Sequence, residues 1–182
     1  MRILLLATAT TLFLAACSST PKAPPVAPAG PTTHAVANLA SASGSLVSGK
    51  VTLTSMPGGV HVTGVVGGLP ANGTFGFHVH EKGDCSAVDA TSAGGHFNPA
   101  TTTHGRVHHG AHHAGDMDNL QSDAEGVVTV NAHLAGATLG DGSATDIAGR
   151  GVIVHADPDD YVSQPTGNAG ARVACGVITV TH

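Results

Sequence analysis

The chain has 182 residues, 13 of them histidine, and seven Lys and Arg against twelve Asp and Glu give a formal net charge of −5. Two of the seven basic residues, Arg2 and Lys22, lie near the N-terminus, so the rest of the chain is more acidic still. A surface so poor in Lys and Arg argues against nucleic acid and acidic lipid headgroups as partners.

The first seventeen residues have the form of a signal peptide. Arg2 supplies a positive charge, and Ile3 to Ala16 form an apolar run that is too short for a transmembrane helix. The run ends in Leu14-Ala15-Ala16-Cys17, which resembles a bacterial lipobox. We therefore predict that residues 1–17 are a lipoprotein signal peptide with Cys17 as the lipidated residue, which would anchor the protein to a membrane of the cell envelope, on the periplasmic side. A plain secretory signal that ends near a cysteine is the alternative.

Residues 18–33 contain half of the chain's ten prolines. Pro, Ala, Ser and Thr cannot bury a core, so this segment is predicted to be a disordered tether. At about 3.1 Å per residue it would reach roughly 50 Å from the bilayer. Residues 34–182 are long enough to form one domain with its own core.

Apolar and polar residues alternate in several short runs of this domain. Val51 and Leu53, Val60 and Val62, and later Val128 and Val130 each have a polar or small residue between them. Glycine-rich breakers separate the runs, and no sustained helical period is present, which is typical of an all-β sandwich or barrel. The segments from Cys85 to about Asp123 and from Ala156 to Gly170 do not alternate, and their length predicts two functional loops.

A pair of histidines lies in one of the predicted strands. His78 and His80 share one strand face with Gly76, while Phe77 and Val79 point to the other face. Two imidazoles at this spacing, with a glycine beside them, form half of a transition-metal site. Such a pair also occurs by chance, so it needs support from the surrounding sequence.

Four segments supply that support, because they resemble, in the same order, segments of the copper/zinc superoxide dismutases. They are Gly76-Phe77-His78-Val79-His80-Glu81-Lys82-Gly83-Asp84-Cys85, Gly94-Gly95-His96-Phe97-Asn98-Pro99, Gly149-Arg150-Gly151-Val152-Ile153-Val154-His155, and the stretch from Gly167 to Ile178. The resemblance implies a Greek-key β-barrel or sandwich of about eight antiparallel strands with two long loops. It also implies dismutation of superoxide to O2 and H2O2, which would protect the cell envelope.

The resemblance further implies two metal sites that share one histidine. Copper would be held by His78, His80, His96 and His155, and zinc by His96, His104, His113 and Asp116. His113 is preferred over His112 because it keeps the family's His-x-x-Asp spacing to Asp116. Asp159 would accept hydrogen bonds from one copper ligand and one zinc ligand, which would fix both rings.

Two residues are implied to act in catalysis. Arg172 would guide the superoxide anion and dock it beside the copper, since its guanidinium is suited to a small anion. His96 would take up a proton and pass it to the second superoxide. Cys85 and Cys175, the two cysteines of the domain, are predicted to form a disulfide in an exported chain.

Several alternatives stay open at this point. An envelope lipoprotein that stores or delivers copper and zinc without turnover would also need a histidine set. His108, His109 and His112 exceed the family's ligands, and they form either a solvated loop or a weak metal-capture patch. His61 and His133 fall on the polar phase of their strands and are expected to face solvent. The resemblance also allows a homodimer, for which the sequence locates no interface.

Overall fold

The computed structural model describes residues 32–181. The predicted signal peptide, Cys17 and nearly all of the predicted tether lie outside the described residues, as does His182. Among the residues that are described, no helix is both long and apolar enough to cross a membrane.

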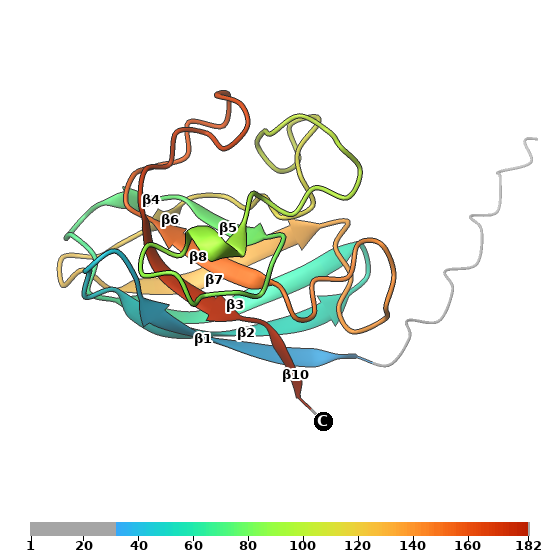
Figure 1. Cartoon of the computed structure of the whole chain (residues 1–182), viewed down its shortest axis with the longest axis horizontal. Helices are drawn as coiled ribbons and strands as arrows, with labels where there is room; N and C mark the ends of the chain where they lie inside the picture. Colours follow the sequence, from blue (N-terminus) through green and yellow to red (C-terminus); the bar gives the residue numbers. More distant parts are fainter. Residues whose placement is uncertain (1–31, 182) are drawn as a thin grey trace, which may run out of the picture.

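The fold is all-β, as predicted, and its main sheet has eight strands in which every pair is antiparallel. The sheet curls into a half-barrel (Figure 1) in the order β5-β8-β9-β1-β2-β3-β7, with β10 pairing to β1. The strands are β1 (His34–Ser41), β2 (Ser48–Met56), β3 (Gly59–Gly67), β5 (Phe77–His80), β7 (Val128–Ala135), β8 (Gly151–His155), β9 (Arg172–Val177) and β10 (Thr179–Thr181). Since β9 returns to lie beside β1, the order β9-β1-β2-β3 is that of a Greek key.

The alternating runs form the strands that enclose the core. In the β2–β3 pair, Leu53 lies opposite Val62, and both side chains are buried. Val130 of β7 is also buried and belongs to the same apolar cluster. A shift of one residue in the register would move these side chains to the solvent face, so the hydrophobic pattern fixes the pairing.

The strand that carries the first histidines pairs with the strand that carries the last one. His78 of β5 lies opposite Ile153 of β8, and His80 lies opposite Gly151, which has no side chain. Between β4 (Thr74–Phe75) and β5, Gly76 lets the loop after β8 approach, because a Cβ at this position would lie 2.8 Å from that of Ala169. A register shift at Val154/His155 interrupts the β8–β9 ladder at the end of β8, and such irregularities redirect side chains.

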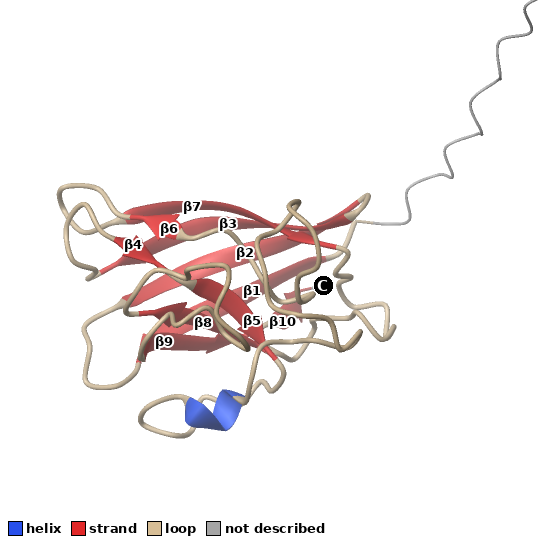
Figure 2. Cartoon of the chain, turned by 90° about the horizontal axis from the view of Figure 1, so that it is seen from above, coloured by secondary structure: helices blue, strands red, loops and turns tan. Residues whose placement is uncertain are grey.

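Two long loops lie on the same side of the sheet (Figure 1). The first, residues 81–119, contains the 3-10 helix η1 (Thr91–Ala93) and ends before β6 (Leu120–Gln121), which pairs with β4. Figure 2 shows η1 at the edge of the sheet, near β8 and β9. The second loop, residues 156–171, connects β8 to β9. A disulfide between Cys85 and Cys175 ties the first loop to β9, with a Cα–Cα distance of 5.8 Å.

Candidate metal centre

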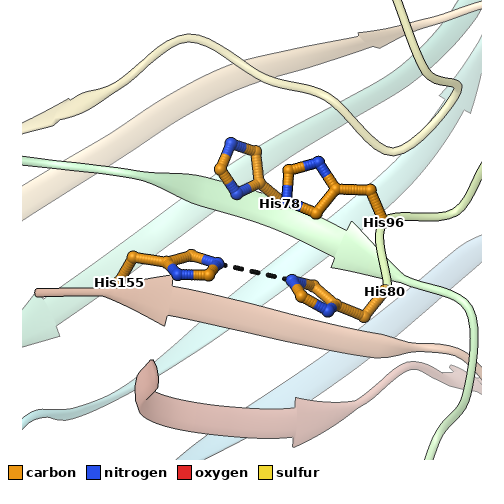
Figure 3. Close-up of side chains that lie close together, drawn as sticks. All are labelled: His78, His80, His96 and His155. Atoms are coloured by element: carbon orange, nitrogen blue, oxygen red, sulfur yellow. Dashed lines mark hydrogen bonds between the residues drawn. The ribbon is translucent and has the colours of Figure 1, made fainter. Parts of the chain in front are cut away.

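Four buried histidines converge between β5, β8 and the first loop. The ligand atoms of His78, His80, His96 and His155 all lie within 4.8 Å of one another. Figure 3 shows the four rings gathered from β5, β8 and the first loop, with His80 and His155 facing each other. The rings of His78 and His96 lie closest, with centroids 4.0 Å apart. The structure thus brings together all four residues predicted to bind copper.

The hydrogen bonds of His80 and His155 leave two ring nitrogens turned toward each other. His80 Nδ1 donates to the carbonyl oxygen of Gly94 at 2.9 Å, and His155 Nδ1 is 3.4 Å from that of Gly170. With these tautomers, assigned from the carbonyl partners, both Nε2 atoms carry lone pairs. The two Nε2 atoms are 3.3 Å apart. Two lone pairs that face each other in a buried site repel unless a cation lies near both, which is the arrangement expected of metal ligands.

A second buried group lies next to the first. The ligand atoms of His96, His104, His113 and Asp116 also fall within 4.8 Å of one another. Asp116 is 1% exposed, and its Oδ1 accepts from His96 Nδ1 at 2.8 Å. Its Oδ2 lies 3.0 Å from His104 Nδ1, and its Oδ1 lies 3.4 Å from His113 Nδ1, yet neither of these nitrogens has a hydrogen-bond partner. His112, the alternative to His113, is outside this group.

The buried nitrogens without hydrogen bonds test whether the residues fit metals. His78 Nδ1, His96 Nε2, His104 Nδ1 and His113 Nδ1 are buried and have no hydrogen-bond partner. An unpaired buried polar atom costs about 1–3 kcal/mol, and such atoms are uncommon. Metal coordination would satisfy all four. A four-imidazole set suits copper, and a set of three nitrogens and one carboxylate suits zinc, so both groups fit the expected metals.

Asp159 connects the two groups. Its Oδ2 accepts from His78 Nε2 at 2.8 Å, and its Oδ1 accepts from His104 Nε2 at 2.9 Å. The carboxylate is buried, and the backbone N–H of Tyr161 also donates to Oδ1 at 2.7 Å. Because the Nε2 atom of each ring is used as a donor, each Nδ1 is left free to bind a metal.

Burial makes three of the histidines neutral. Burial, with a further effect from His96, lowers the pKa of His80 to about 2. Burial, with a further effect from His78, lowers the pKa of His155 to about 3. Burial likewise lowers the pKa of His96 to about 4, although its hydrogen bond to Asp116 acts in the opposite direction. A neutral imidazole is the form that binds a metal, so these three rings need not lose a proton first.

The pKa of His104 is shifted in the opposite direction. Burial lowers its pKa, but the close carboxylates of Asp116 and Asp159 outweigh burial and raise the pKa to about 9. Burial raises the pKa of both carboxyls, whereas the histidine rings that face them, His104 among them, bring each pKa below its usual range. Two ionised carboxylates therefore flank His104, and a metal bound at its Nδ1 would displace a proton.

Arg172 lies at the start of β9, beside the four-histidine group. Its Nη1 donates to the carbonyl oxygen of Ala90 at 2.7 Å and its Nη2 to that of Gly94 at 2.6 Å. The carbonyl oxygen of Gly94 also accepts from His80 Nδ1, so Arg172 and His80 share an anchor. Burial lowers the pKa of Arg172, but a guanidinium stays charged in proteins. The half-buried cation therefore lies close to the candidate copper ligands.

Three residues that hold the site in place are absent from the sequence predictions. The side chain of Asn119 makes two hydrogen bonds with the backbone of Asp159. Its Nδ2 donates to the carbonyl oxygen of Asp159, and its Oδ1 accepts from the N–H of Asp159, both at 2.9 Å. The side chain of Gln164 likewise accepts a hydrogen bond from the N–H of His104 and donates one to its carbonyl oxygen. Arg150 lies over the ring of Phe97, 3.7 Å from its centroid, and donates to the carbonyl oxygen of Glu81. These contacts depend on loop conformation, and although Arg150 lies in one of the four family-like segments, no motif predicts what it contacts.

The surplus histidines have different environments. His109 is exposed, and His112 Nδ1 donates to the carbonyl oxygen of His113 at 2.8 Å. His61 and His133 lie on the outer face of the sheet, as expected, but each is only partly exposed. At His133, the ring of His108 from the first loop covers the imidazole, with centroids 5.9 Å apart.

Comparisons with known proteins show the family to which the chain belongs. Residues 47–178 match the family model described as copper/zinc superoxide dismutase (SODC). The chain is 42% identical over 135 residues to "Superoxide dismutase [Cu-Zn] 2" of Aquifex aeolicus, covering 72% of this chain and 79% of that one. It is also 42% identical over 136 residues to "Superoxide dismutase [Cu-Zn]" of Caulobacter vibrioides, with coverage of 72% and 78%.

Solved structures agree with the sequence matches. A SOD-like protein from Bacillus subtilis aligns with a TM-score of 0.71 at 36% identity, covering 78% of this chain and 96% of that one. The clock protein EA4 aligns with a TM-score of 0.73 at 38% identity, covering 81% and 94%. Since the matched region contains eight of the ten described strands and both histidine groups, the chain belongs to the copper/zinc superoxide dismutase family and is an enzyme that uses copper and zinc.

Proposed function

We propose that the protein dismutates superoxide in the cell envelope, with copper held by His78, His80, His96 and His155, and zinc held by His96, His104, His113 and Asp116. The observation that carries the proposal is the position of His96, which belongs to both groups. Its Nδ1 faces Asp116 in the zinc group, and its Nε2 is buried without a hydrogen bond. A ring with one nitrogen for each metal is what a bridging ligand requires.

Bound copper would supply one-electron chemistry, since it cycles between two oxidation states at nitrogen-rich sites, which zinc cannot do. The protein's own residues bind the substrate and move a proton. Arg172 attracts and orients the superoxide anion beside the four-histidine group. When it is not bound to copper, His96 would carry a proton at Nε2 and deliver it to the second superoxide. Two superoxide anions and two protons thereby yield one O2 and one H2O2.

The N-terminal sequence and the disulfide support the proposed cellular location. Lipidation of Cys17 would hold the protein at a membrane, and the Pro-rich residues 18–33 would keep the domain at a distance from it. The Cys85–Cys175 disulfide is consistent with an oxidising compartment such as the periplasm. Both features support a role in protecting the envelope.

Elemental analysis and a dismutation assay on the same purified sample test the proposal. We expect one copper and one zinc per chain, with turnover proportional to copper. His155→Gln should remove copper and turnover, whereas His109→Gln, a change of the same kind at an exposed histidine, should preserve both. Full zinc occupancy without copper uptake or turnover, under copper-replete conditions, would favour metal storage.

A further inference from the structure

A short backbone ladder joins the first loop to the end of β5 at the candidate copper centre. In this ladder His96 lies opposite His80 in an antiparallel bridge. Two backbone hydrogen bonds of 2.9 Å flank the bridge, and their donors are the N–H groups of Phe97 and Glu81. The ladder therefore holds the shared ligand His96 beside the copper ligand His80, with ring centroids 5.0 Å apart.

Arg150, the last residue before β8, contacts both sides of this ladder. On the side of the first loop, its guanidinium carbon lies 3.7 Å from the centroid of the buried Phe97 ring, which is close enough for a cation–π contact. On the side of β5, its Nη1 donates to the carbonyl oxygen of Glu81 at 2.7 Å. Phe97 and Glu81 each directly follow a candidate copper ligand in the chain. One side chain thus connects the two halves of the ladder.

The position of Arg150 is itself fixed by the fold. Its Nε donates to the carbonyl oxygen of Asp146 at 2.8 Å, and its own carbonyl oxygen accepts from the N–H of Ile178 at 2.9 Å. The carboxylate of Asp146 in turn accepts from three backbone N–H groups of the loop before β8. The planar guanidinium makes its two hydrogen bonds and its ring contact in one orientation, so the three contacts support one another.

We propose that Arg150 is a positioning residue for the dismutation reaction, which fixes the distance between His80 and His96 by clamping the ladder that joins them. The inference rests on the proposed copper site and adds to it a residue that supplies no ligand atom. In the proposed reaction His96 is bound to copper at one stage and carries a proton at another, so it must return to the same place in each cycle. A ladder that is held on both sides gives His96 that place.

Copper binding by Arg150→Met tests the proposal, since methionine keeps an unbranched apolar side chain and removes the charge and every donor. Outer partners of metal ligands typically contribute about 10–100-fold in affinity, and we expect a loss in this range when copper affinity is measured by competition with a chelator. The electron paramagnetic resonance spectrum of bound Cu²⁺ should change, and turnover per copper should fall. Arg150→Lys retains the charge without the planar donors, so its values should lie between those of the wild type and Arg150→Met.

Amide hydrogen exchange of the metal-free protein tests the clamp separately from copper. In Arg150→Met the N–H groups of Phe97 and Glu81 should exchange about tenfold faster, the factor expected for the loss of one hydrogen bond from a charged donor. Amides of the β2–β3 ladder should change less, because Arg150 contacts neither strand. A wild type that bound no copper would overturn the proposed function and this role with it, whereas wild-type behaviour of Arg150→Met would overturn the role of Arg150 alone.

The matched control is Arg106→Met, because Arg106 also lies over an aromatic ring, that of Tyr161 at 5.2 Å, and pairs with Asp118 outside the ladder. It should keep the copper affinity, the spectrum and the exchange rates of the wild type. The role of Arg150 is overturned if Arg150→Met keeps the wild-type copper affinity and spectrum, if exchange rises equally throughout the sheet, or if Arg106→Met shows the same losses. Should Arg150→Met fail to fold, Arg150→Lys decides the matter by the same measurements.

Discussion

Arg172 connects the first loop to the candidate copper ligands while contributing no ligand atom of its own. It donates to the carbonyl oxygens of Ala90 and Gly94 and lies at the start of β9. We expect Arg172→Ile to slow turnover strongly while copper and zinc stay bound, because the substrate loses a cation and donors. Turnover per bound copper, measured with metal content, checks this.

Arg172→Lys is the matched control, since it retains the charge and loses the planar arrangement of donors. Its loss of turnover should be smaller, and the wild-type rate should respond to salt more than that of the Ile variant. Unchanged turnover per copper in Arg172→Ile would remove Arg172 from the mechanism. Loss of copper from that variant would indicate a structural role.

Asp159 accepts hydrogen bonds from one histidine of each group. In Asp159→Asn one of the two oxygens becomes an NH2 group, which cannot accept from an N–H. We expect the affinity for the metal on that side to fall by about 10–100-fold. Competition with a chelator measures this. Asp160→Asn, next in the chain and exposed, should leave both affinities unchanged, and equal losses in the two variants would contradict the role of Asp159.

The histidine pKa values predict how the stability of the metal-free protein depends on pH. The pKa values of His80, His96 and His155 are about 2, 4 and 3 in the folded state, against 6.5 when unfolded. Below about pH 6.5 the unfolded chain therefore binds more protons, and stability falls as the pH drops toward 4.

His104 acts at the other end of the pH range. Its folded pKa of about 9 contributes stability that is fully present below 6.5 and is lost as the pH rises through 9. Denaturant unfolding of the metal-free protein at about pH 5, 7 and 9 should show the greatest stability near neutrality. Greater stability at the acidic pH than at neutrality would contradict these pKa values.

The disulfide links the first loop to β9, the strand that also carries Arg172. Cys85 and Cys175 are 90 residues apart, and removal of a native disulfide from a small domain typically costs about 2–5 kcal/mol. We expect the Cys85→Ser, Cys175→Ser double variant to lose stability in this range. Its turnover per copper should also fall, because the anchors of Arg172 lie on the same loop. Denaturant unfolding and the dismutation assay measure the two effects, and an unchanged unfolding midpoint would contradict the first.

The elements differ in how well the sequence predicts them. Strands β2, β3 and β7 follow from alternation, because one face of each packs on the core. The two-residue strands β4 and β6 and the helix η1 are too short to show a period, and they lie in or beside loops.

The residues of the site also differ in how well the sequence predicts them. The residues of both histidine groups could be named from motifs because they lie in or beside segments that resemble a known family. The contacts of Asn119, Gln164 and Arg150 could not be predicted, since each reaches backbone atoms whose positions depend on the folded loops. The partial burial of His133 was missed for a similar reason, because the loop that brings His108 over it is distant in sequence.

At the scale of the whole molecule, membrane attachment and metal chemistry should be separable. Cys17 lies before the Pro-rich residues 18–33, whereas every candidate metal ligand lies in the folded domain. Cys17→Ala should move the protein from the membrane fraction to the soluble fraction while turnover per copper is unchanged. Fractionation and labelling with radioactive palmitate check this prediction. If palmitate never enters the wild-type protein, Cys17 is not lipidated.

The carboxylate of Asp159 has one oxygen on each histidine group, and we therefore expect it to couple the two metals energetically. A metal bound at His104 would fix the carboxylate, and the fixed carboxylate would in turn orient His78 for the other metal. Such coupling is reciprocal: the factor by which zinc raises the affinity for copper equals the factor by which copper raises the affinity for zinc. The free energy of the fully loaded protein therefore does not depend on the order of loading, and a shortage of either metal would weaken the binding of the other.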